Sequence, residues 1–229
     1  MRPAIRISAL SHLGSVWVFT HDSIGVGEDG PTHQPVEQLA ALRCIPNLVT
    51  LRPADANEVA QAWKIAIENR NRPTALALTR QNVPTLDRSQ FASAEGVQRG
   101  AYVLADLGGG QPEVILMASG SEVSLIVEAG KRLVELGRSV RLVSFPSWEL
   151  FAEQDQAYRD SVLLPEVRAR VAVEAGVSQG WRQWVGDQGR ILALDRFGAS
   201  APGEVVFKMF GFTPERVAEL ALETLAPKG

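Results

Sequence analysis

Short apolar runs alternate with stretches of helical period along this chain, and such alternation is typical of parallel α/β proteins. Three runs in the first part have the length of buried strands. They lie at residues 15–20, 48–51 and 74–79. A helix is predicted over residues 36–43, between the first two strands. The first part is therefore predicted to form a parallel sheet with helical connections.

A second helix is predicted between the strands at 48–51 and 74–79. Asp55 is suited to cap its N-terminus, because an aspartate oxygen accepts hydrogen bonds from backbone amides that have no partner inside the helix. Apolar side chains then recur at intervals of three and four residues, which places them on one face. This stripe consists of Val59, Ala62, Trp63, Ala66 and Ile67. We expect it to pack against the sheet.

Periodicity disappears over residues 81–100, where polar, proline and glycine residues dominate, as in connections between domains. Beyond this connection, strands are predicted at 113–118, 139–145, 170–174 and 190–194, and a helix is predicted at 121–136. Gly137 is placed to end that helix, and Thr213 with Pro214 to begin a final one.

The two parts differ in the number of predicted strands. A doubly wound sheet normally contains five or six strands, whereas the first part supplies about three. We therefore predict an α/β fold in two domains. Residues 1–90 form a partial doubly wound parallel sheet, and residues 100–229 form a complete small α/β domain.

Composition narrows the choice of partners and location. The chain of 229 residues is 45% hydrophobic and 21% charged, as is usual for a soluble globular protein. Its net charge is −3 without a basic block, so nucleic acid is not expected as a partner. Without an apolar run of ~20 residues or a signal peptide, the protein is expected to be cytoplasmic and without a membrane partner. The single cysteine, Cys44, is expected to serve as a small apolar side chain.

A polar, glycine-rich segment at residues 20–35 directly follows the first predicted strand. In open parallel sheets, ligands bind at the carboxyl ends of strands, so a site is expected here. The segment contains two of the three histidines, His21 and His33, and the carboxylate Asp29. Imidazoles suit proton transfer and the recognition of phosphates and hydroxyls, and a carboxylate accepts hydrogen bonds from hydroxyls. These three side chains are the main candidate site residues.

Two other interpretations of this segment stay open on composition alone. It can be a solvated loop without function. His21, Asp29 and His33 can also be considered as metal ligands, although their spacing matches no standard site. The third histidine, His12, precedes the first strand and is expected to be a surface or packing residue.

Arg80 ends the predicted strand at 74–79. If this strand is parallel to the one at 15–20, both carboxyl ends lie at the same edge of the sheet, and Arg80 approaches His21. A guanidinium there can bind a phosphate with two parallel hydrogen bonds. The alternative is an arginine that only extends into solvent from a strand end. The small residues at 118–125, before a helix, are a weak signal for anion binding.

The sequence THDSIGVGEDGPTHQP at residues 20–35 resembles the signature of the transketolases, thiamine-diphosphate enzymes that transfer a two-carbon ketol unit between sugar phosphates. Other segments resemble transketolase sequences in the same order, among them LRPADANEVAQAW, LALTRQNVP, ASGSEVSL and DRFGASAPGEVVFKMFGFTPERVAELA. The resemblance covers essentially the whole chain. It implies a transferase of the pentose phosphate pathway that uses thiamine diphosphate and magnesium.

The resemblance also implies roles for individual residues. His21 and Arg80 match the histidine and arginine that hold the terminal phosphate of the sugar substrate. Asp29 matches an aspartate that binds a substrate hydroxyl and enforces stereochemistry. His33 matches the histidine beside the reactive carbon, which contacts donor hydroxyls and the aminopyrimidine of the cofactor. His33 is thus the candidate catalytic and cofactor-binding residue, and no residue of this chain matches a metal ligand of the family.

The chain corresponds to the second half of the family's pyrimidine-binding domain followed by its C-terminal domain. The Gly-Asp-Gly motif for diphosphate and magnesium, the glutamate that activates the aminopyrimidine, and most of its aromatic cradle have no match here. We therefore expect the isolated chain to be inactive and to act as a homodimer or with a complementing N-terminal chain. The alternatives are a non-catalytic assembly or regulatory module, and part of a related thiamine-diphosphate enzyme such as dihydroxyacetone synthase.

Overall fold

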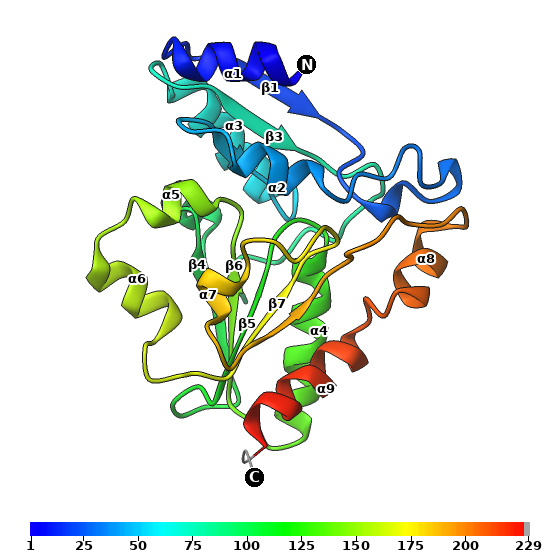
Figure 1. Cartoon of the computed structure of the whole chain (residues 1–229). Helices are drawn as coiled ribbons and strands as arrows, with labels where there is room; N and C mark the ends of the chain where they lie inside the picture. The colour runs from blue at the N-terminus through cyan, green and yellow to red at the C-terminus, as the bar shows by residue number, and fades with distance from the viewer. Residues whose placement is uncertain (227–229) are drawn as a thin grey trace.

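Three predicted strands of the first part form a parallel sheet in the order β1-β3-β2. Figure 1 shows β1 and β3 side by side. The computed structural model describes residues 1–226. It places the strands at Val16–Phe19 (β1), Val49–Leu51 (β2) and Thr74–Ala77 (β3). Phe19 lies opposite Ala77, and Leu51 lies opposite Leu76, so the three strands end at the same edge. The predicted parallel pairing is confirmed.

Helices cover both faces of this sheet. They are α1 (Arg2–Leu10), α2 (Gln38–Arg43) and α3 (Ala56–Glu68), and the 3-10 helix η1 (Ile24–Asp29) follows β1. Ile5 of α1 and Leu42 of α2 belong to a cluster with Ala75 on one face. Ala62 of α3 belongs to the larger core with Leu76 on the other face.

The helix that Asp55 begins differs from the prediction in the face that it buries. Asp55 caps α3 as predicted, because its side chain accepts a hydrogen bond from the amide of Glu58. However, Trp63 is 38% exposed and Ile67 is 56% exposed, so the predicted stripe is wrong at its two largest members. The face of α3 that is buried includes Glu58 and Ile65 instead. The reason is that α3 also packs against the part of the chain beyond residue 100, which we call the second unit, where Tyr102 donates a hydrogen bond to Glu58.

The second unit contains a five-stranded sheet in the order β4-β6-β5-β7-β8. Its strands are β4 (Tyr102–Leu107), β5 (Val114–Ala118), β6 (Val140–Ser144), β7 (Arg170–Val173) and β8 (Arg190–Leu192). The last four are parallel and match predicted strands. The pattern does not predict β4, which runs antiparallel to β6 at the edge of the sheet. With both sheets in place, the α/β fold class is confirmed.

Helices also cover both faces of the second sheet (Figure 1). They are α4 (Glu122–Glu135) and α9 (Pro214–Leu225) on one face and α5 (Trp148–Ala152), α6 (Gln156–Leu163) and α7 (Arg182–Val185) on the other. The 3-10 helix η2 (Ala94–Arg99) packs mainly against α3, and α8 (Gly203–Met209) packs against η1. Along β5, Leu116 packs in the core with α4 and α9, whereas Ile115 and Met117 pack in a second cluster with α5, α6 and α7. The strand is buried on both faces, which explains its continuous apolar sequence.

Several smaller predictions have clear outcomes. Gly137, with a φ of +76°, follows α4, and the Thr213 side chain caps α9. His12 is exposed, as expected for a surface residue. Cys44 is a free cysteine and is also exposed, at the end of α2, and its expected role as a small apolar side chain stays a prediction. No helix within residues 1–226 combines the length and the apolar character needed to cross a membrane.

A buried ion pair joins the two units. Arg43 of α2 donates two hydrogen bonds, of 2.6 and 2.7 Å, to the carboxylate of Glu174 after β7. The Arg43 guanidinium also lies 3.8 Å from the ring centroid of Trp148. Burial alone would raise the pKa of Glu174, but Arg43, with help from Arg52, outweighs it and lowers this pKa from 4.5 to about 2.

The Arg43–Glu174 pair predicts a pH dependence of stability. Because the folded chain lowers the pKa of Glu174 from 4.5 to about 2, the stabilisation is complete above pH 4.5 and is lost as the pH falls toward 2. Its size near neutral pH is about 3 kcal/mol by proton linkage. The wild-type and Glu174→Gln chains should therefore differ by about this amount at neutral pH in chemical denaturation. The two curves should converge in acid, and a gap that does not change with pH would contradict the assignment.

Candidate active site

The segment after β1 folds back over the carboxyl edge of the first sheet, and we call residues 20–34 the site loop. His21 has a φ of +64° and turns the chain away from the strand. Gly27 and Gly30, with φ values of +81° and +75°, supply further left-handed positions that favour glycine. The loop closes where Nε2 of Gln34 donates a hydrogen bond of 2.8 Å to the carbonyl oxygen of Gly27.

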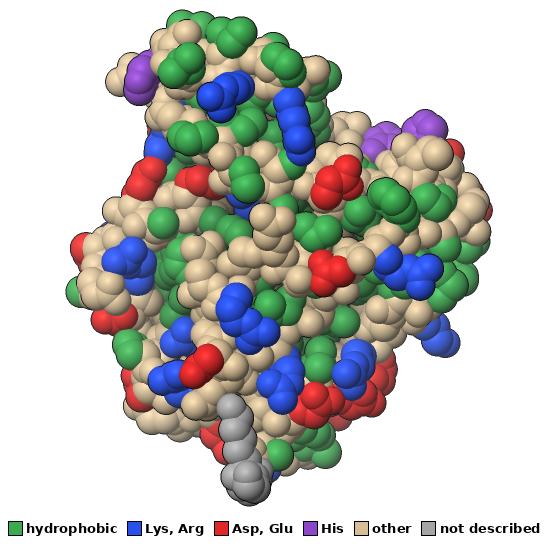
Figure 2. Space-filling model, viewed as in Figure 1, with side chains coloured by type: hydrophobic (Ala, Val, Ile, Leu, Met, Phe, Trp, Pro, Cys, Tyr) green, Lys and Arg blue, Asp and Glu red, His purple; other side chains and the backbone are tan. Residues whose placement is uncertain are grey.

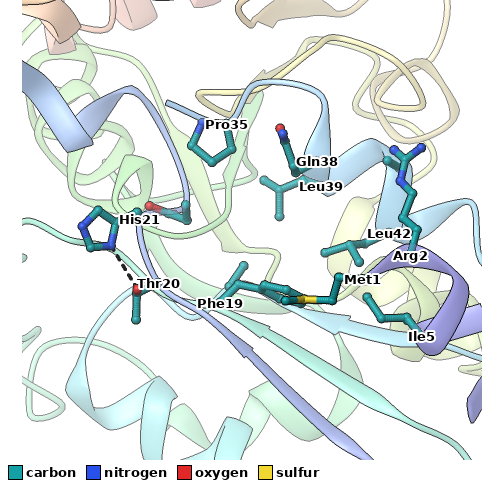
Figure 3. Close-up of a pocket in the computed structure, with 13 residues that line it drawn as sticks. Met1, Arg2, Ile5, Phe19, Thr20, His21, Pro35, Gln38, Leu39 and Leu42 are labelled. Carbon is teal, nitrogen blue, oxygen red and sulfur yellow. Dashed lines mark hydrogen bonds between the residues drawn. The ribbon is translucent and has the colours of Figure 1, made fainter. Parts of the chain in front are cut away.

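His21 lies at the edge of a cavity of about 230 Å³ between β1, α1 and α2 (Figure 3). The lining is largely apolar and includes Phe19, Leu39 and Leu42. The His21 imidazole Nδ1 lies 2.9 Å from the hydroxyl of Thr20, as the dashed line in Figure 3 shows. The predicted site residue therefore borders a cavity that could hold an apolar part of a ligand.

Asp29 and His33 both lie on the exposed side of the site loop. Nδ1 of His33 is 2.9 Å from the hydroxyl of Thr32. Figure 2 shows histidine side chains together at the rim of the molecule, at its upper right, with another histidine at the opposite side. The two predicted site residues are thus presented to solvent, where a ligand can reach them.

Arg80 follows β3 and lines a separate groove of about 910 Å³ between the two units. Residues 25–28 form one wall, and α8 with the beginnings of α4 and α9 forms the opposite wall. The parallel pairing of β1 and β3 places His21 and Arg80 at the same edge of the sheet. Among the described residues, however, His21 lines the cavity of about 230 Å³ and Arg80 lines the groove of about 910 Å³. The binding of one phosphate by both side chains therefore stays a prediction.

Behind the site loop lies a buried ionic cluster. Arg52 follows β2, is fully buried and donates from Nε to the carboxylate of Asp22 over 2.7 Å. Its other nitrogens donate to the carboxylate of Glu122 and to the carbonyl oxygen of Ser119. Burial disfavours the charged guanidinium, but Glu122 and Asp22 together raise the pKa of Arg52 above its ordinary value. Arg52 is therefore held as a cation between the site loop and the second unit.

The turn before α4 is filled by side chains of the protein itself. Ser119 donates a hydrogen bond of 2.6 Å to Glu174, and Ser121 donates one of 2.6 Å to Glu122. The carboxylate of Glu122 also accepts a hydrogen bond from the amide of Ala175. A carboxylate of the chain thus stands where a helix N-terminus favours negative charge. This arrangement favours the packing interpretation of residues 118–125 over the binding of an external anion.

Sequence reasoning singled out neither Arg52 nor Gln34. The signal for Arg52 was present, because it follows a predicted strand of the same sheet as Arg80 does. Nothing local distinguishes Gln34 from a solvated loop residue, although it is 3% exposed in the fold. Within residues 1–226, no three His, Cys, Asp or Glu side chains come together as metal ligands, so His21, Asp29 and His33 do not form such a cluster.

The fold defines an α/β protein. Its candidate ligand site consists of His21, Asp29, His33 and Arg80, which lie at or beyond the carboxyl edge of a parallel sheet. Two family models match this chain. They are "Transketolase, pyrimidine binding domain" over residues 1–85 and "Transketolase-like TK C-terminal domain" over residues 100–213.

Individual transketolases are similar to this chain in sequence and in structure. A curated transketolase of Aquifex aeolicus is 55% identical over 97% of this chain and 32% of its own length. One of Geobacillus stearothermophilus is 54% identical over 95% of this chain and 32% of its own length. A crystal structure of a Pichia stipitis transketolase complex with sedoheptulose 7-phosphate gives a TM-score of 0.91 at 45% identity, over 98% of this chain and 32% of that chain.

The chain belongs to the transketolase family. It spans about a third of the length of the curated relatives that it matches, 32% for the first two. A solved structure named "Split gene transketolase, inactive beta4 tetramer" shares the fold, and its "beta4" is unrelated to strand β4 of this chain. The TM-score is 0.72 at 22% identity, over 92% of this chain and 66% of that chain.

Proposed function

We propose that this chain supplies the substrate-binding side of a transketolase site, at which a two-carbon ketol unit passes between sugar phosphates. The observation that carries the proposal is the parallel pairing of β1 with β3. It brings His21 and Arg80, which match the family's phosphate-binding residues, to one edge of the sheet. The site loop then presents Asp29 and His33 on the same side.

Each of these side chains has a distinct task in the proposal. His21 and Arg80 bind the terminal phosphate of the sugar through charge-assisted hydrogen bonds. Asp29 accepts a hydrogen bond from a substrate hydroxyl and so selects its configuration. His33 binds hydroxyls of the donor beside the reacting carbon and moves a proton there. The exposure of Asp29 and His33 supports roles that require direct contact with substrate.

Thiamine diphosphate would supply the centre that stabilises the carbanion. The described residues fit only part of its site. They include no cluster of metal-ligating side chains for the magnesium that would bind the diphosphate. We propose that the family's N-terminal part would hold the diphosphate and the metal and that His33 would contact the aminopyrimidine. The cytoplasmic location expected from the sequence is part of this proposal.

We also propose a complementing chain that carries the N-terminal part of the family's domains. The first sheet supports this proposal, because β1 is an edge strand and its Val16 and Val18 side chains are 37% and 45% exposed. An apolar strand edge is a surface that another chain can cover. A homodimer is the alternative assembly.

Mixing two purified chains tests the proposal. This chain is combined with the upstream part of the Aquifex relative, thiamine diphosphate and magnesium, and transfer from a ketose phosphate to an aldose phosphate is followed. We expect transfer by the mixture and by neither chain alone. A stable complex without transfer would instead support a non-catalytic assembly module. Transfer by this chain alone would contradict the division of the site.

A further inference from the structure

Gln34, the last residue of the site loop, connects this loop to the second unit. Its Nε2 donates one hydrogen bond of 2.8 Å to the carbonyl oxygen of Gly27 and another of 2.9 Å to the carbonyl oxygen of Ala199. The side chain is buried, and both of its amide hydrogens are used. Turning the amide over would place Oε1 against two carbonyl oxygens, so its orientation is fixed.

Residues 198–203 of the second unit are shaped to receive the site loop, and we call them the receiving segment. A Cβ at Gly198 would lie only 1.8 Å from Oε1 of Gln34, so the position next to this amide requires glycine. Ser200 donates a hydrogen bond of 2.5 Å to the carbonyl oxygen of Glu28. A Cβ at Gly27 would lie 3.0 Å from the amide nitrogen of Gly203, so the two backbones are in close contact.

Every one of these contacts ends beside a candidate site residue. Gln34 directly follows His33, while Gly27 and Glu28 directly precede Asp29. The amide of Gln34 therefore joins the arm of the loop that carries His33 to the arm that carries Asp29. The receiving segment holds both arms at once, because it contacts Gln34 on one side and Glu28 on the other.

We propose that Gln34 and the receiving segment are positioning elements that set the separation of Asp29 and His33. The second unit thereby determines the geometry with which the site loop meets substrate hydroxyls. For its effect on catalysis this inference rests on the proposed function, whereas its effect on the loop is a property of this chain by itself.

Gln34→Glu tests the inference, because it keeps the shape of the side chain and removes both donated hydrogen bonds. Gln98→Glu is the matched control. It makes the same change in charge at an exposed position, where Nε2 donates only to Gln61. In Gln34→Glu, amide hydrogen exchange over residues 24–34 should rise about 10- to 100-fold at neutral pH, since two buried hydrogen bonds are lost. Exchange in β5 should not change, and Gln98→Glu should match the wild type.

The pH dependence of exchange separates positioning from general destabilisation. Once protonated in mild acid, the new carboxyl group can donate one hydrogen bond again, so the excess exchange of the loop should shrink. Equal loop exchange in Gln34→Glu and Gln98→Glu would overturn the inference. The inference would also be overturned if exchange in Gln34→Glu rose equally in β5, because Gln34 would then stabilise the whole chain rather than the site loop.

Gly198→Ala changes the contact between Gly198 and Gln34 without changing Gln34 itself. It tests the inference also if Gln34→Glu fails to fold. The added methyl group should displace Gln34 and raise exchange over residues 24–34 as Gln34→Glu does. Adding Gln34→Ala should relieve the clash, so the double variant should melt no lower than Gly198→Ala alone. Unchanged loop exchange in Gly198→Ala would contradict the inference.

Activity gives a separate measurement in the mixed enzyme. Gln34→Glu should lower kcat/KM about 10-fold or more at neutral pH and recover part of it in mild acid, whereas Gln98→Glu should keep wild-type activity. If the wild-type mixture shows no ketol transfer, the proposed function fails while the exchange result still decides the positioning inference. If transfer occurs and Gln34→Glu equals Gln98→Glu in both measurements, only the positioning inference fails.

Discussion

Replacing Arg52 with methionine should lower the free energy of unfolding by about 3–5 kcal/mol, because the change leaves two buried carboxylates without their cation. Asp22 and Glu122 both have fully buried side chains and both pair with Arg52. For a chain of this size, the loss corresponds to a melting temperature lower by roughly 6–20 °C. Thermal and denaturant unfolding of the purified chain measure it directly.

Arg72→Met is the matched control for this experiment. Arg72 also joins the two units, through an ion pair with Glu153, but their side chains are 23% and 50% exposed. Solvent screens such a pair, so its loss should cost about 1 kcal/mol or less. Equal losses for Arg52→Met and Arg72→Met would contradict the larger stabilisation assigned to the buried Arg52 cluster than to the exposed Arg72–Glu153 pair.

Arg80→Ala should lower kcat/KM of the mixed enzyme for a phosphorylated acceptor by about 10- to 150-fold. This range corresponds to about 1.5–3 kcal/mol, the contribution of hydrogen bonds to a charged group. The same variant should leave an unphosphorylated acceptor almost unaffected, because that acceptor has no phosphate for the guanidinium to bind. Steady-state kinetics with a matched pair of acceptors measures the difference.

Lys208→Ala provides the control within the same groove. Lys208 of α8 is a second cation that lines the groove with Arg80, and the proposal gives it no contact with the phosphate. The Lys208→Ala enzyme should therefore retain the wild-type preference for phosphorylated acceptors. An equal loss with both acceptors in Arg80→Ala, or an equal effect of Lys208→Ala, would contradict the role assigned to Arg80.

The strands were predictable where both faces are buried. The four residues of β3 and the five of β5 are all buried, and all except Thr74 are apolar, so these strands differ clearly from the surrounding helices. β4 lies at an edge and buries mainly Tyr102 and Leu104, which gives a weaker signal. The short helix α1 was missed because its buried residues are few, namely Ile5, Ser8 and Ala9.

The candidate site was predictable only as far as local sequence and parallel topology reach. The strand ends place His21 and Arg80 at one edge, and this follows from the alternation of strands and helices. The contacts of Arg52 with Glu122 and of Gln34 with Ala199 join residues 70 and 165 positions apart, which no local pattern reveals. Packing between the two units likewise turns Trp63 to the surface. The domain limits at 90 and 100 and the roles of the four site residues stay predictions.

The central proposal is that the described residues bind the substrate, whereas tight binding of thiamine diphosphate needs the family's N-terminal part. A calorimetric titration of thiamine diphosphate with magnesium tests it most directly, with this chain alone, the complementing chain alone and their mixture. We predict a dissociation constant weaker than about 1 mM for this chain alone and about 1 µM or tighter for the mixture. A dissociation constant of about 1 µM for this chain alone would contradict the account.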